Sequence, residues 1–99
     1  MAENPMDVIR DFDTPLHSII AEHRAFCFED GVLSKKIKYL IALSLDASHG
    51  ATEGVKALAV EAKKNGASKD EIMEALRVAN FVTGVGCIYT AARALKDIF

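Results

Sequence analysis

The chain has 99 residues, of which 51% are hydrophobic and 26% are charged, and its formal net charge is -2. A domain of this length buries only about 60 to 65% of the surface that its unfolded chain exposes, so we expect no sizeable pocket inside one copy. The slightly acidic balance and the lack of a basic cluster argue against nucleic acid and anionic membrane surfaces as partners.

The first ten residues, MAENPMDVIR, lack the basic start and the apolar run of a signal peptide. No uninterrupted apolar stretch reaches the length of about 18 residues that suggests a membrane span. The two cysteines, Cys27 and Cys87, lie sixty residues apart in apolar surroundings and predict neither a disulfide framework nor a metal site. We therefore expect a cytoplasmic protein that needs no metal and no other cofactor.

Two helices are predicted in the N-terminal third, over about 5–12 and 15–29. Each begins where a residue with a capping side chain precedes a proline: Asn4 before Pro5, and Thr14 before Pro15. A proline at the first helical position loses nothing, because its missing N–H would have no partner there. Gly31 marks the end of the second helix.

The next two predicted helices cover about 35–48 and 51–64. Ser34 is the expected cap of the first, and both carry apolar residues at three- and four-residue steps. Gly54 destabilises the predicted helix over about 51–64 by about 1 kcal/mol relative to alanine. Either another helix approaches closely at Gly54 or a small ligand fills the space there, and both alternatives stay open.

Ser68 and Glu71 have the Ser-x-x-Glu spacing of a capping box and predict the start of a fifth helix. A last apolar stripe runs from Val85 to Phe99. The intervening TGVG follows no strand and lacks a third glycine, so we reject a dinucleotide-binding fingerprint. No strand pattern occurs, and the sequence predicts a single all-α domain of about six helices over 1–99.

The order of these signals resembles the carboxymuconolactone decarboxylase family, which includes the alkyl hydroperoxidase D-like proteins. The resemblance covers about 30–98 and rests on LSKKIKYLIALSL, KKNGASKDEIMEAL and VANFVTGVGCIYTAARAL. It implies the alkyl hydroperoxidase D-like helical fold, with a central antiparallel helix hairpin over about 35–48 and 51–65. It also implies a homo-oligomer, either a trimer or a hexamer, which agrees with more apolar side chains than one small core can hide.

Redox-active members of this family begin the fourth helix with Cys-x-x-Cys-x-x-x-His. A helix N-terminus lowers the pKa of a thiol there, and the second cysteine can close a disulfide. By this resemblance the three motif positions fall on Ala51, Gly54 and Leu58, none of which can do that chemistry. The decarboxylase members keep the histidine, here Leu58, and the family's proton-relay glutamate falls on Tyr39. We therefore expect no thiol peroxidase activity.

A replacement acid/base site is one hypothesis for the emptied positions. Asp46, His49 and Glu53 lie close to one face if the helix continues through this stretch, and a carboxylate beside an imidazole orients it for proton transfer. His49 is then the proton-transfer group, Asp46 its orienter and Tyr39 a hydrogen-bond donor. A small organic acid or lactone is the candidate ligand. The candidate cleft-lining residues are Ala51, Glu53, Gly54, Leu58, Cys87 and Tyr89.

Structural roles account for the same residues. His49 can interact with free carbonyls at a helix C-terminus, and Tyr39 can pack in the interior. His23 and Cys27 stand four residues apart, but two side chains do not make a zinc site. Two further hypotheses therefore stand beside the acid/base site: a non-catalytic oligomeric binding or scaffold protein that kept the fold, and thiol chemistry moved to Cys27 or Cys87.

Overall fold

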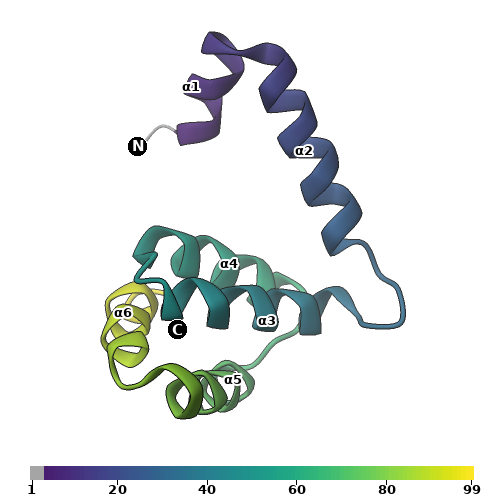
Figure 1. Cartoon of the computed structure of the whole chain (residues 1–99). Coiled ribbons are helices and arrows are strands. Elements are labelled where there is room, and N and C mark those ends of the chain that lie inside the picture. The colour runs from purple at the N-terminus through teal and green to yellow at the C-terminus, as the bar shows by residue number, and fades with distance from the viewer. Residues whose placement is uncertain (1–3) are drawn as a thin grey trace.

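A computed structural model of the chain describes residues 4–99, which form six helices and no strand (Figure 1). The helices are α1 (Pro5–Phe12), α2 (Thr14–Phe28), α3 (Lys35–Ser48), α4 (Thr52–Lys64), α5 (Lys69–Thr83) and α6 (Gly86–Leu95). The predicted all-α class is confirmed. The last helix is shorter than the apolar stripe suggests, because residues 96–98 form turns. None of the described helices is long and apolar enough to cross a membrane.

Capping side chains determine where several helices begin. Ser34 Oγ accepts a hydrogen bond from the third residue of α3, and the capping box of α5 is complete. In that box Ser68 Oγ accepts from the N–H of Glu71 at 3.0 Å, while Glu71 Oε1 accepts from the N–H of Ser68 at 2.9 Å. Two orphan N–H groups are thus satisfied at once.

The predicted cap of α2 is wrong by one residue. Asp13 is the cap, because its carboxylate accepts a hydrogen bond from the N–H of Leu16 at 3.0 Å. Thr14 is already helical, and its hydroxyl donates to the carbonyl of Arg10 at 2.8 Å. Asp and Thr are both good caps, and Asp13 takes this position because its backbone, with φ -152° and ψ 82°, is the one that leaves the helical conformation between α1 and α2.

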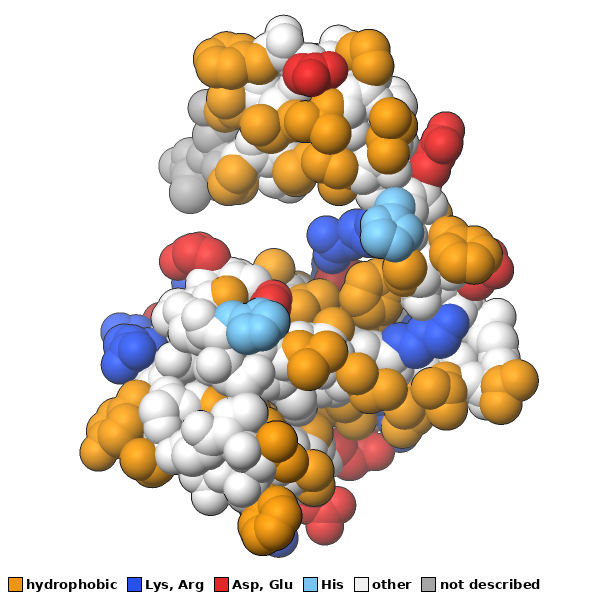
Figure 2. All heavy atoms as spheres, in the orientation of Figure 1, with side chains coloured by type: hydrophobic (Ala, Val, Ile, Leu, Met, Phe, Trp, Pro, Cys, Tyr) orange, Lys and Arg blue, Asp and Glu red, His pale blue; other side chains and the backbone are white. Residues whose placement is uncertain are grey.

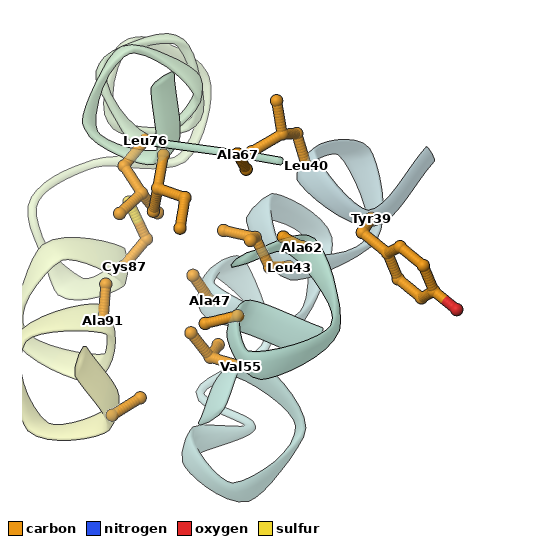
Figure 3. Close-up of a cluster of buried hydrophobic side chains, with 13 residues drawn as sticks. Tyr39, Leu40, Leu43, Ala47, Val55, Ala62, Ala67, Leu76, Cys87 and Ala91 are labelled. Atoms are coloured by element: carbon orange, nitrogen blue, oxygen red, sulfur yellow. The ribbon is translucent and has the colours of Figure 1, made fainter. Parts of the chain in front are cut away.

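Helices α3 to α6 pack around one apolar core. The α3–α4 hairpin lies at its centre, with α5 against α3 and α6 against α4. The largest fully buried side chains are Leu43, Ile72, Leu76 and Val55, and several alanines fill the space between them. Figure 3 shows these side chains meeting between the helices. The small alanine side chains let the helix axes come close together.

Helices α3 to α6 form the body of the protein, and helices α1 and α2 form an arm that stands away from it (Figure 1). The two pack on each other, and no side chain of either helix is buried. The arm meets the body at its C-terminal end, where the Phe28 ring stacks on Tyr39 with centroids 4.5 Å apart. The radius of gyration is 14.1 Å, against about 12.6 Å for a compact domain of this length. One copy is therefore extended.

Candidate functional site at the α3–α4 turn

The predicted helical face through Asp46, His49 and Glu53 is interrupted by a turn. His49 is the C-cap of α3, and Gly50 reverses the chain with a φ of +75°. The N–H of Ala51 donates to the carbonyl of Asp46 at 2.9 Å, which closes the end of α3. The helix does not continue through Gly50, so these three side chains come from two helix ends rather than from one face.

The Asp46 carboxylate lies against the backbone of Gly54. A Cβ atom on Gly54 would overlap Asp46 Oδ2 and would lie 2.9 Å from Asp46 Cγ. Gly54 is in the first turn of α4, whose N-cap, Ala51, offers no side-chain hydrogen bond. A carboxylate is favourable at this end because the helix dipole is positive there. Close approach of α3 thus explains the missing side chain at Gly54.

His49 is exposed at the end of α3. Its backbone N–H donates to the carbonyls of Leu45 and Asp46 at 3.1 and 3.2 Å. Within residues 4–99 its imidazole makes no hydrogen bond and no ion pair. The half-buried Asp46 lies one turn earlier, so the structure brings the imidazole and the carboxylate to the same end of α3 without joining them.

Tyr39 lies far from this turn. It precedes Asp46 by seven residues, which is about 10 Å along the helix axis. Only 8% of Tyr39 is exposed, and its ring is stacked on Phe28. Figure 3 shows the phenol directed away from the other core side chains. Of the two predicted roles of Tyr39, hydrogen-bond donor at a site or packing residue, its position agrees with packing.

The predicted cleft-lining residues do not share one cleft. Leu58 packs against the core, and Cys87 is 3% exposed within it, whereas Tyr89 is 64% exposed. Residues two apart on a helix do not face each other, so Cys87 and Tyr89 lie on different sides of α6. The structure gathers five candidates at the α3–α4 turn: Asp46, His49, Ala51, Glu53 and Gly54. It separates Tyr39, Cys87 and Tyr89 from them, whereas Leu58 lies one turn after Gly54 on α4 and packs against the core.

The two thiols have opposite environments. Cys27 is exposed on α2, and Cys87 is buried in α6. A reactive thiol must be accessible, and Cys27 meets this requirement whereas Cys87 does not. In the part of the chain that the structure describes, no three His, Cys, Asp or Glu side chains come together as metal ligands would.

Comparison with known proteins supports the resemblance seen in the sequence. A family model described as "Carboxymuconolactone decarboxylase family" matches residues 15–97. The chain belongs to the carboxymuconolactone decarboxylase family. The apo crystal structure of a carboxymuconolactone decarboxylase family protein from Legionella pneumophila is similar, with a TM-score of 0.86 and 25% identity. The match covers 92% of this chain and 81% of that chain. The comparison with curated proteins finds no match.

These matches confirm the predicted family and fold, and they extend beyond the body. The family model begins at residue 15 and therefore includes α2 as well as the residues 30–98 that carry the sequence resemblance. The Legionella match covers 92% of the chain, so it includes most of the α1–α2 arm. The arm is thus part of the fold that this carboxymuconolactone decarboxylase family member shares with the crystal structure.

This family member has an apolar groove between α3 and α5 that was not predicted from the sequence. Its volume is about 380 Å³, and its lining residues are Ile37, Leu40, Ile41, Ser44, Leu45, Ser48, Ala75, Val78, Ala79, Val82 and Thr83. The three hydroxyls among them donate to carbonyls of their own helices. The groove therefore offers almost no free polar group. A signal was present: Ile37, Ile41 and Leu45 form a second stripe at four-residue steps beside the core stripe.

An ion pair joins the two helices that flank this groove. Lys36 Nζ lies 2.8 Å from Glu71 Oε2, linking the first turn of α3 to the first turn of α5. The hydrogen bond from Lys36, together with the one from the backbone N–H of Ser68, lowers the pKa of the Glu71 carboxyl below its usual range. Both side chains are about one-third exposed, so solvent screens the pair.

Proposed function

We propose that this member of the carboxymuconolactone decarboxylase family is a non-catalytic oligomeric binding or scaffold protein without thiol peroxidase activity. The observation that carries the proposal is the filled space at Gly54. By resemblance, redox-active members hold at this position the second cysteine of the motif, which closes the disulfide. Here the Asp46 carboxylate lies against the glycine instead. A carboxylate beside the helix N-terminus stabilises the helix but cannot undergo thiol–disulfide exchange.

The remaining motif positions support the same proposal. The side chain at Leu58, where the resemblance places the family's histidine, packs against the core. The side chain at Tyr39, where it places the proton-relay glutamate, is buried under Phe28. The two cysteines lie sixty residues apart in the sequence, one exposed and one buried. A disulfide cycle needs two thiols whose Cα atoms come within about 7 Å, and these environments do not favour such a pair.

Acid/base chemistry at His49, on a small organic acid or lactone, is the second candidate function. It is favoured by one observation: the exposed imidazole of His49 and the partly exposed carboxylate of Asp46 lie at the same end of α3. Histidine is the side chain whose unperturbed pKa suits proton transfer near neutral pH. Tyr39 has no part in this second function, because it lies about 10 Å away along the helix.

Turnover assays on matched variants separate the two functions. Peroxide consumption with a thiol reductant and conversion of a panel of small organic acids and lactones, followed by NMR, would be measured for wild type and His49→Ala. His23→Ala, an exposed histidine on α2, is the control. We expect no turnover in any of the three. Turnover that is lost in His49→Ala and kept in the control would establish the second function. If wild type consumed peroxide, Cys27→Ser would be assayed as a fourth protein, and loss of peroxide turnover in it would contradict both candidate functions.

A further inference from the structure

We propose that the groove between α3 and α5 is the docking site for the α1–α2 arm of a second copy of this chain. The inference deepens the proposed scaffold function and rests on its oligomeric part. It identifies the two surfaces that meet and the way in which they pair. Each copy supplies one arm and one groove, so in any closed assembly every copy donates one arm and receives one.

The exposed surface of one copy is larger than its mass requires. The accessible surface is 6788 Å² for a chain of 10.7 kDa. A compact monomer of that mass exposes about 5,500 Å², so the excess is about 1,300 Å². An obligate interface buries about 1,000 Å² or more on each partner. The excess is therefore of the size that a permanent partner covers.

The arm exposes large apolar side chains, beside the charged residues Asp7, Arg10 and Asp11 of α1. Its exposed large hydrophobic side chains are Phe12, Leu16, Ile19, Ile20 and Phe26. Figure 2 shows hydrophobic side chains over much of the arm and an open space between most of the arm and the body. Soluble monomers rarely leave an apolar face of this extent exposed. Within α2 the two charged side chains, Glu22 and Arg24, have opposite signs, so docking of α2 brings no net charge to the partner.

The groove matches the arm in chemistry and length. No charged residue lines it, and its rim residues Val78 and Val82 are 66% and 72% exposed. Along α3 the lining runs from Ile37 to Ser48, which is about 17 Å, and α2 has 15 residues, which is about 22 Å. A helix of that length spans the groove from end to end. An ionic ligand or a nucleic acid would find no partner for its charge there.

The arm cannot reach the groove of its own copy. Figure 1 shows the arm on one side of the α3–α4 hairpin and α5 on the opposite side. Two hydrogen bonds also fix the conformation of the connection between α2 and α3. Lys38 Nζ donates to the carbonyl of Glu29 at 2.7 Å, and the N–H of Lys35 donates to the Asp30 carboxylate at 2.8 Å. These bonds and the Phe28 stack direct the arm away from its own groove and toward another copy.

Two charge-introducing variants and their mixture test the pairing. Ile19→Glu places a carboxylate on the arm, and Val82→Glu places one in the groove. Ala57→Glu, on an exposed position of α4 outside both surfaces, is the matched control. All three sites are exposed in one copy, so folding is kept and circular dichroism verifies it. The mass of each sample would be measured by sedimentation velocity between about 1 and 100 µM, where strong assemblies with nanomolar to micromolar Kd are populated.

We expect wild type and Ala57→Glu to assemble, and Ile19→Glu and Val82→Glu to raise the dissociation constant about 100-fold or more, because an unpaired charge enters an apolar contact. An equal mixture of the two variants should assemble again. The first retains an intact groove and the second an intact arm, so one good contact forms. A misfolded variant could not produce this rescue.

Several results would overturn the proposal. If arms paired only with arms, Val82→Glu would stay assembled, and if grooves paired only with grooves, Ile19→Glu would stay assembled. A mixture that stays monomeric, or a wild type that stays monomeric with a small molecule bound in native mass spectra, would also exclude the arm as the occupant. Assembly that persists in both variants overturns this docking and leaves the scaffold proposal standing. His49-dependent turnover has the opposite effect, because it overturns the scaffold proposal and leaves the docking intact.

Discussion

Gly54 and Asp46 act as a pair at the start of α4. The glycine leaves room for the carboxylate, and the carboxylate lies at a helix N-terminus whose cap, Ala51, has no hydrogen-bonding side chain. The sequence predicts that Gly54 lowers the stability of its helix, and it shows that Asp46 is nearby in the chain. That the acid fills the space of the missing side chain depends on the geometry of the Gly50 turn, which no local pattern encodes.

A double-mutant cycle would detect this pairing. Gly54→Ala brings the higher helix propensity of alanine, worth about 1 kcal/mol, but its Cβ displaces the Asp46 carboxylate, which is worth about 0.3 to 1 kcal/mol at a helix N-terminus. We expect Gly54→Ala to be nearly neutral in wild type and to stabilise the Asp46→Ala background by about 1 kcal/mol. Urea unfolding of the four proteins gives both values. Equal effects in the two backgrounds would show that the residues act independently.

At the scale of elements, caps and periodicity predicted all six helices, because these signals act within one or two turns of chain. The complete capping box of Ser68 and Glu71 is an example. The second bond of Glu71, to Lys36, was beyond prediction because the two residues are 35 positions apart and meet only when α3 packs on α5. The same packing creates the groove between the two helices.

The Lys36–Glu71 pair makes stability depend on pH. The folded protein lowers the pKa of Glu71, so the stabilisation is present above the pKa of the unfolded carboxyl and is lost as pH falls through the folded pKa. We expect Glu71→Gln to be less stable than wild type at about pH 7, and the difference to shrink as the pH falls below the pKa of the unfolded carboxyl and the wild-type carboxyl takes up its proton. Urea unfolding at several pH values measures the difference.

Glu74→Gln is the control for that experiment, because Glu74 is exposed on the same helix and has no ion pair within residues 4–99. Its difference from wild type should change little with pH. If the Glu71→Gln difference were also independent of pH, the ionised carboxylate would have no role in stability, and the bond to Lys36 would be a surface contact without energetic effect.

At the scale of the whole molecule, helices α3 to α6 bury a hydrophobic core, whereas the arm has no buried side chain. A protein that assembles to cover such an arm gains stability by mass action. We expect the thermal midpoint of wild type to rise by several degrees between about 5 and 500 µM protein, and that of Ile19→Glu to stay constant. Scanning calorimetry across this range measures both. A midpoint of wild type that does not change with concentration would show that the arm stays uncovered in solution.

By itself, the sequence determined the helices, the caps of α1, α3 and α5, the family and the lack of a Cys-x-x-Cys motif, because each of these is written in neighbouring residues. Only the tertiary structure decided which of the candidate side chains meet. Tyr39 and Leu58 turned out to pack while Asp46 came to lie on Gly54, since those outcomes depend on how the helices turn and cross. The groove and the extended arm also depend on the tertiary structure. The packing of α3, α4 and α5 determines which apolar stripe is buried and which is left for a partner.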